Sequence, residues 1–138
     1  MDRQIIAEKL ESLRHCISRV EQKRPSKAAA FEDDFDLQDI ISVNLERAVQ
    51  LCVDISSHIL SSSEQDVPDT MADTFLQLNK LDILTDSTAK VMKKAVGFRN
   101  IAVHNYHKIN WEIVFNITKY QVDDFKQFAH EVNAYLDS

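Results

Sequence analysis

The sequence predicts an all-α protein: an up-and-down bundle of four main helices and short helices, folded as a single domain over residues 1–138. The first observation is that the chain has one glycine and two prolines, too few for the many turns of a β-rich protein. The second is that apolar residues recur at spacings of three and four over long stretches. The third is that 138 residues, 44% of them hydrophobic, can build one core but hardly two.

Two long helices account for the first half of the chain. The first is predicted from about Arg3 to Lys23, where apolar residues mark one face and Pro25 ends the pattern. The acidic stretch over residues 27–36 is expected to be a loop or a frayed helix start. The longest helix follows, from about Phe35 or Leu37 to Leu60. It carries a polar stripe whose simplest interpretation is a solvated face, made of Arg47, Gln50, Asp54 and His58.

Four further helices are predicted in the second half. Pro68 precedes a helix cap at Asp69 or Thr70, and a short helix then runs from Met71 to about Asn79. A long helix follows a cap at Thr85 or Asp86 and spans residues 87–104. Asn110 is expected to cap a short helix over residues 111–117, and the last helix covers residues 121–135.

The two cysteines and the apolar runs suggest where the protein works. Cys16 and Cys52 are isolated and sit at apolar helix positions, so we expect buried thiols in a reducing compartment and no disulfide. No apolar run approaches the ~18 residues needed to span a bilayer, and no signal-peptide core is visible. The sequence therefore predicts a cytoplasmic protein with no membrane partner.

The charge is distributed unevenly along the chain. The net charge of −6 by itself disfavours nucleic acid, because phosphate binding uses Lys and Arg. Residues 87–111, however, contain no acid and carry a charge of +5, which leaves −11 for the rest of the chain. These residues form a basic island that is a candidate RNA-binding surface, made of Lys90, Lys93, Lys94, Arg99 and Lys108.

The same segment contains the pattern Arg99-Asn100-x3-His104-x-Tyr106. It combines a permanent cation, an amide and a group that titrates near neutral pH, a set suited to a phosphodiester. RNA supplies its own nucleophile, the 2′-hydroxyl, so no cofactor is required. The cysteines, histidines and acids show no metal-binding spacing, and we expect no metal.

A helical projection at 100° per residue separates the motif into faces. Lys93, Asn100 and His104 share one face, and Arg99 lies about 140° from His104. Arg99 interrupts a second apolar strip, made of Met92, Val96 and Val103. Since a helix with two apolar strips usually buries both, we expect this strip to meet a symmetric partner in a homodimer.

The stretch from Arg99 to Tyr106 resembles the R-x4-6-H signature of HEPN-superfamily ribonucleases, in the R-x4-H-x-Y form of HepT-like toxins. Residues 46–58, 68–84 and 109–114 are similar to the family's flanking segments. The resemblance implies a HEPN-type bundle and a homodimeric, metal-independent endoribonuclease, the toxin of a toxin–antitoxin pair. Its RNA substrate would be cut in a cleft where the two motifs meet.

The resemblance also implies roles for individual residues. Arg99 and His104 would be the catalytic pair, with Asn100 as a polar helper. Asp54, together with His58, would line the cleft. Tyr106 matches the tyrosine that the partner, an MntA-type nucleotidyltransferase antitoxin, modifies with AMP to give O-AMP-tyrosine.

Two alternatives remain open from the residues themselves. In one, the helical dimer is a binding module that partners a nucleotidyltransferase and cuts nothing. In the other, the motif only supports the dimer contact, and Arg99→Ala would weaken the dimer without changing any RNA activity. Loss of cleavage in an intact dimer would distinguish the ribonuclease from both.

Overall fold

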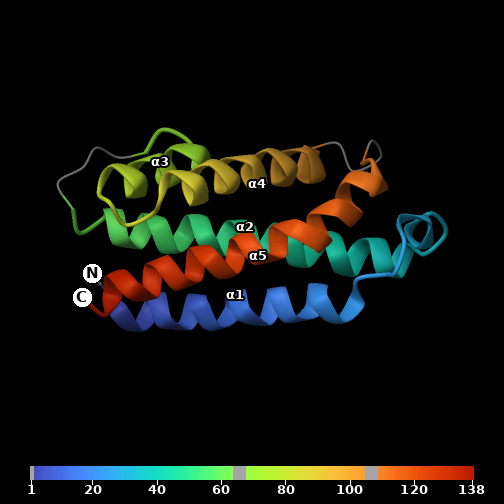
Figure 1. Ribbon diagram of the computed structural model, residues 1–138, viewed down its shortest axis with the longest axis horizontal. Helices are drawn as coiled ribbons and strands as arrows, with labels where there is room; N and C mark the ends of the chain where they lie inside the picture. Colours follow the sequence, from blue (N-terminus) through green and yellow to red (C-terminus); the bar gives the residue numbers. More distant parts are fainter. Residues whose placement is uncertain (1, 64–67, 105–108) are drawn as a thin grey trace.

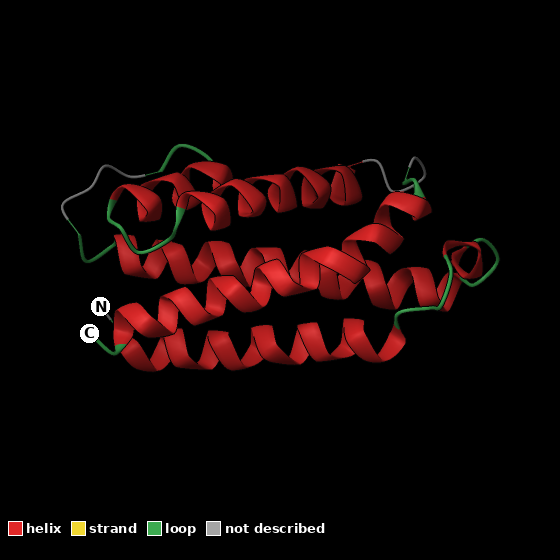
Figure 2. Ribbon diagram, viewed as in Figure 1, coloured by secondary structure: helices red, strands yellow, loops and turns green. Residues whose placement is uncertain are grey.

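The computed structural model describes residues 2–63, 68–104 and 109–138, with residues 101–104 described as backbone only. Within these ranges the chain forms five α-helices and one 3-10 turn (Figure 2). This confirms the all-α prediction. The elements are α1 (Arg3–Lys23), η1 (Ala28–Phe31), α2 (Phe35–Leu60), α3 (Met71–Lys80), α4 (Asp86–His104) and α5 (Trp111–Leu136).

The four long helices run up and down side by side (Figure 1). α2 and α5 each pack against both α1 and α4, and the short α3 covers α2 and α4. The start of α1 is joined to the end of α5, because the Arg3 guanidinium donates to the backbone carbonyl of Leu136. Both termini therefore lie at the same end of the bundle.

Side-chain caps set where the helices begin. The carboxylate of Asp34 accepts a hydrogen bond from the Leu37 amide, and the Thr70 hydroxyl accepts one from the Asp73 amide. Asn110 caps α5, and Thr85 accepts from the Thr88 amide in the first turn of α4. Each such cap typically contributes about 1 kcal/mol. The caps expected at Thr70, Thr85 and Asn110 are confirmed.

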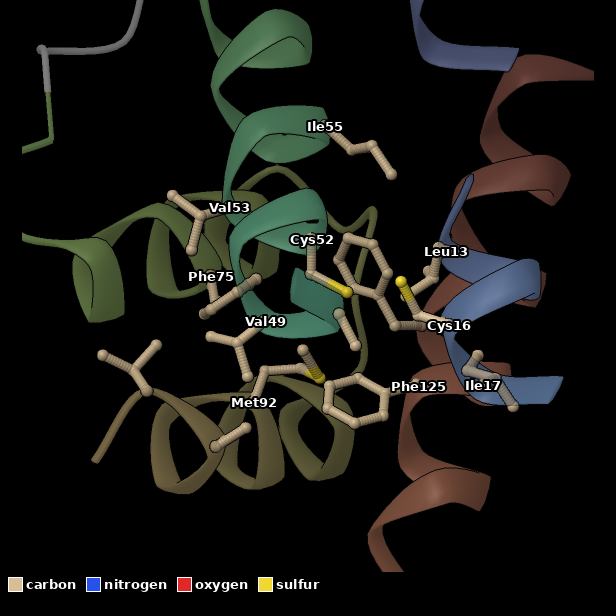
Figure 3. Packing of buried hydrophobic residues seen from close by; sticks show 14 of the residues in the cluster. Leu13, Cys16, Ile17, Val49, Cys52, Val53, Ile55, Phe75, Met92 and Phe125 are labelled. Atoms are coloured by element: carbon tan, nitrogen blue, oxygen red, sulfur yellow. The ribbon is translucent and has the colours of Figure 1, made fainter. Parts of the chain in front are cut away.

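One continuous core joins the helices. In Figure 3, Cys52 of α2 faces Cys16 of α1, whereas Val49 of α2 points toward Met92 of α4, and Phe125 of α5 lies beside Met92. The aromatic rings of Phe75 and Phe128 meet edge to face, with their centroids 5.9 Å apart. Cys16 and Cys52 are both buried and free, as the sequence indicates.

The C-terminal helix differs from the prediction. The sequence predicts separate helices over residues 111–117 and 121–135, whereas α5 is continuous from Trp111 to Leu136. The residues between the two segments contain neither Gly nor Pro, so nothing stops the helix. Thr118, one of these residues, is fully buried, and its hydroxyl donates to the Phe115 carbonyl at 2.6 Å.

The expectation that the second apolar strip of α4 meets a symmetric partner is also wrong in part. Met92 is 0% exposed and Val96 is 5% exposed, and both belong to the protomer's own core. The reason is that α4 packs against α2, α3 and α5 at once, which covers both of its apolar strips. The side chain of Val103 lies outside the described residues.

Glu131 fixes the start of α4 from α5. Its carboxylate is 9% exposed and accepts hydrogen bonds from the Thr85 amide at 2.7 Å, from the Thr88 hydroxyl and from the Gln127 side chain at 2.9 Å. Burial raises the pKa of Glu131, but the hydrogen bonds lower it more, so the net pKa lies below the ordinary value. The carboxylate thus stabilises the positive end of α4.

We therefore predict that Glu131→Gln lowers the free energy of unfolding by about 1–3 kcal/mol at neutral pH, because buried donors lose a charged acceptor. A group whose pKa is depressed by folding stabilises the protein above its unfolded pKa and loses that effect as the pH falls through its folded value. The deficit of the variant should therefore shrink below about pH 4. Urea unfolding at several pH values measures it. The exposed Glu32→Gln serves as the control, and an equal loss there would contradict the assignment.

Candidate functional site

Arg99 lies on the side of α4 that faces α2. Its side chain is half-buried, and its Nη2 donates a hydrogen bond to Oε1 of Gln50 at 3.2 Å. The guanidinium is therefore held against α2 of its own protomer. This differs from the expectation that Arg99 belongs to a dimer strip with Met92 and Val96.

Gln50 passes the contact on to a third helix. Its Nε2 donates to Oδ1 of Asp54 at 2.9 Å, and Oδ2 of Asp54 lies 3.7 Å from Nζ of Lys9 on α1. Since Asp54 accepts from the amide nitrogen, the amide oxygen of Gln50 is turned toward Arg99. We call this chain of Arg99, Gln50, Asp54 and Lys9 the polar relay.

Glu46 is an acidic neighbour of Arg99. It lies one turn before Gln50 on α2, and its side chain is half-buried. Burial raises the pKa of the Glu46 carboxyl, and the positive charge of Arg99 partly offsets this rise. An anion that binds Arg99 must therefore compete with a carboxyl group already beside it.

The helix directions decide which α2 residues can approach the end of the motif. α2 and α4 run antiparallel (Figure 1). At 1.5 Å per residue, His104 lies about 7.5 Å beyond Arg99 in one direction, whereas His58 lies about 12 Å beyond Gln50 in the other. A single protomer therefore places His58 far from His104. Asp54 lies between Gln50 and His58 on α2, and Gln50 links it to Arg99.

Three lysines of the basic island and Asn100 lie on exposed parts of α4, and Lys108 lies outside the described residues. Lys90, Lys93, Lys94 and Asn100 are all exposed. Lys94 faces Asp124 on α5: burial and the charge of Asp123 raise the pKa of Asp124, and Lys94 partly offsets the rise. Lys94 therefore lies toward α5, whereas Arg99 lies toward α2.

His104 and Tyr106 lie partly or wholly outside the described residues. His104 is the last residue of α4, and its side chain lies outside the described residues, as does all of Tyr106. Among the residues that are described, no three His, Cys, Asp or Glu side chains converge on a point where a metal could bind. None of the described helices is long and apolar enough to cross a bilayer.

The structure adds residues that the sequence did not single out. Gln50 was seen only as part of a polar stripe, and Glu46 and Lys9 were not proposed at all. Glu46, Gln50 and Asp54 are spaced four residues apart, which places them on one helix face. That spacing can be read from the sequence, but the sequence does not show which helix packs against this face.

Comparisons with known proteins agree with the motif. Residues 13–132 match the family described as ribonuclease HepT-like. The mRNA nuclease HepT of Shewanella oneidensis is 35% identical over 130 residues, covering 94% of this chain and 97% of that protein. The tRNA nuclease HepT of Aphanizomenon flos-aquae is 27% identical over 132 residues, covering 96% and 90%.

Solved structures give the same result. A toxin–antitoxin complex with AMP-PNP contains a chain with a TM-score of 0.89 and 33% identity, covering 96% of this chain and 99% of that one. The tri-AMPylated HEPN toxin of Shewanella oneidensis, in complex with its MNT antitoxin, gives a TM-score of 0.88 and 34% identity, covering 97% and 99%. Together with the family match, these likenesses show that the chain belongs to the HepT-like ribonuclease family of the HEPN superfamily.

Proposed function

We propose that this protein is the RNA-cutting toxin of a toxin–antitoxin pair and acts in the cytoplasm. The observation that supports it best is the contact between Arg99 and Gln50, which holds the motif arginine in a defined position at a half-buried site. Family membership supplies the reaction class, since the relatives from Shewanella and Aphanizomenon are named as nucleases of mRNA and tRNA.

In the proposed reaction the RNA 2′-oxygen attacks the adjacent phosphorus and loses its proton to a general base. The bond from phosphorus to the 5′-oxygen breaks, and that oxygen receives a proton. A histidine side chain can take up and release a proton near neutral pH, and His104 performs these proton transfers. Arg99 stabilises the charge that develops on the phosphoryl oxygens, and Asn100 orients a phosphate oxygen or the imidazole. The products are a 2′,3′-cyclic phosphate and a 5′-hydroxyl.

We further propose that two copies of the chain form the working site. Arg99 and His104 lie about 140° apart around α4, and Arg99 is turned toward its own α2. A symmetric partner that brings its own motif to the cleft lets the arginine of one copy work with the histidine of the other. The exposed Lys90 and Lys93 then attract the RNA backbone toward the cleft.

The proposed partner is a nucleotidyltransferase antitoxin that attaches AMP to Tyr106. The Shewanella relative is AMPylated and bound to an MNT antitoxin. Adenylates at Tyr106, two residues beyond the end of α4, would place phosphate charge and bulky bases near the arginine. They would compete with RNA without any refolding.

A non-catalytic binding module that partners a nucleotidyltransferase remains the second candidate. The net charge of −6 and the acidic Glu46 beside Arg99 favour it, because both weaken the attraction for RNA. This candidate shares the fold and the partner but predicts no cleavage.

We expect His104→Ala to abolish RNA cleavage while the protein stays folded, because the reaction loses its proton-transfer group. The assay incubates total RNA with purified protein in EDTA and detects 2′,3′-cyclic phosphate ends. His130→Ala, on the exposed surface of α5, should cleave like the wild type. Cleavage that survives His104→Ala would refute the assignment, and a wild type that cleaves nothing would favour the binding module.

Gln50→Ala should lower kcat about tenfold to a hundredfold, because the guanidinium of Arg99 loses the contact that orients it. Gln50→Glu keeps an acceptor for Arg99 and should recover part of the loss. Single-turnover cleavage of a short RNA that the wild type cuts measures the rate, and thermal unfolding measures stability. Together they distinguish a loss of Arg99 orientation from a loss of folded protein. Gln22→Ala, an exposed glutamine on α1, is the control. A kcat equal to the wild type in Gln50→Ala would show that the contact is not used.

Tyr106→Phe should prevent neutralisation by the antitoxin, because the variant lacks the oxygen that accepts AMP. Co-expression with the nucleotidyltransferase, followed by mass spectrometry, should show AMP adducts on the wild type and none on the variant. Tyr120→Phe, an exposed tyrosine on α5, should be modified like the wild type. Adducts that persist on Tyr106→Phe would place the modification elsewhere.

A further inference from the structure

A groove between α1 and α2 adjoins the polar relay and has no role in the reaction described above. Its volume is about 420 Å³, within the range of small-ligand sites. We call it the α1–α2 groove. It is lined by Ser12, His15 and Cys16 of α1 and by Arg47, Gln50, Leu51 and Asp54 of α2.

The groove is continuous with the position of Arg99. Gln50 and Asp54 belong both to the groove lining and to the polar relay, and the Gln50 amide oxygen accepts from Arg99. Only the side chain of Gln50 therefore separates a phosphodiester bound at Arg99 from the groove. An RNA strand can extend past this side chain, because its bases project from the backbone on both sides of every phosphate.

The groove has an apolar floor and polar edges. Cys16 is buried and Leu51 is half-buried. Burial raises the pKa of the Cys16 thiol, and the charge of Arg47, which lines the same groove, partly offsets the rise. Arg47 and His15 are exposed and offer two flat groups of the kind on which bases stack.

The charges favour a base over a phosphate. The groove holds one permanent cation, Arg47, and one carboxylate, Asp54, so a phosphate would gain little there. The Asp54 carboxylate has lone pairs beyond the one that accepts from Gln50, and Lys9 approaches its Oδ2 only to 3.7 Å. A carboxylate accepts hydrogen bonds from amino groups such as N4 of cytosine. Uracil carries a carbonyl at that position and would meet the carboxylate unfavourably.

We propose that the α1–α2 groove is a subsite for the nucleobase next to the phosphodiester held at Arg99, and that Asp54 makes it prefer a base with an exocyclic amino group over uracil. The inference rests on the proposed ribonuclease function. It adds a source of base preference that the R-x4-H motif does not contain.

The experiment compares two uncleavable ligands that differ at this group: 2′-O-methyl hexacytidylate and 2′-O-methyl hexauridylate. The 2′-O-methyl group removes the nucleophile, so binding is measured without cutting. The wild type should bind the cytidine oligomer about tenfold more tightly, since one specific base contact is worth that much. Asp54→Asn should bring the ratio of the two dissociation constants close to one. Arg47→Ala and His15→Ala should weaken binding of the cytidine oligomer.

Arg14→Ala and His130→Ala are the matched controls, because both residues are exposed and line a different groove, between α1 and α5. They should bind both oligomers like the wild type. Equal binding of the two oligomers by the wild type, or a ratio unchanged in Asp54→Asn and affinities unchanged in Arg47→Ala, would overturn the subsite.

The outcome is separable from that of the proposed function. A wild type that prefers the cytidine oligomer through Asp54 but leaves RNA intact supports the subsite and refutes the ribonuclease. A wild type that cleaves RNA through His104 but binds both oligomers equally refutes the subsite alone. Where both hold, the mapped cut sites should be depleted in uridine on one side of the cut, and the depletion should vanish in Asp54→Asn.

Discussion

The site depends on how firmly α4 is held between its neighbours. Its first turn is fixed by the Glu131 carboxylate of α5, and its C-terminal half is tied to α2 by the hydrogen bond from Arg99 to Gln50. Between these two points Met92, Ala95 and Val96 are buried in the core. A helix held at its first turn, along its core face and at Arg99 has little freedom to rotate, so the direction in which Arg99 points is set by the bundle.

The sequence alone was enough for the helices that start at caps and follow a regular apolar period. Thr70, Thr85 and Asn110 marked starts that the structure confirms. The sequence alone was not enough where packing between helices determines how far a helix extends or which of its faces is buried. The sequence predicts two helices separated at residues 118–120, but Thr118 is buried and α5 is continuous. Likewise, the periodicity of α4 showed two apolar strips, yet only the packed structure shows that its own helices cover Met92 and Val96.

The same limit applies to the candidate site, where only the residues of one helix could be predicted from the sequence. The motif could be read from residues adjacent in the chain, because Arg99 and His104 lie on one helix. The polar relay could not, because it joins residues of α1, α2 and α4 that are far apart in sequence. Spacing placed Gln50 and Asp54 on one face but gave no sign of what that face meets. Because α2 and α4 run antiparallel, His58 lies far from His104 within one protomer, although the sequence had suggested that both line one cleft.

The acids around Arg99 change what the arginine can do. Glu46 and Asp54 flank Gln50 on α2, and Glu46 is close enough to feel the charge of Arg99. An arginine in open solvent attracts any phosphate, whereas one with carboxyl neighbours in a chain of net charge −6 gains less from a single phosphate. Affinity for RNA must then come from several contacts made together, and a base in the α1–α2 groove would be one of them. With a base in the α1–α2 groove as proposed, the acidic surroundings of Arg99 would make cutting selective, because only a strand that contacts the groove and the arginine at once would stay bound long enough to react.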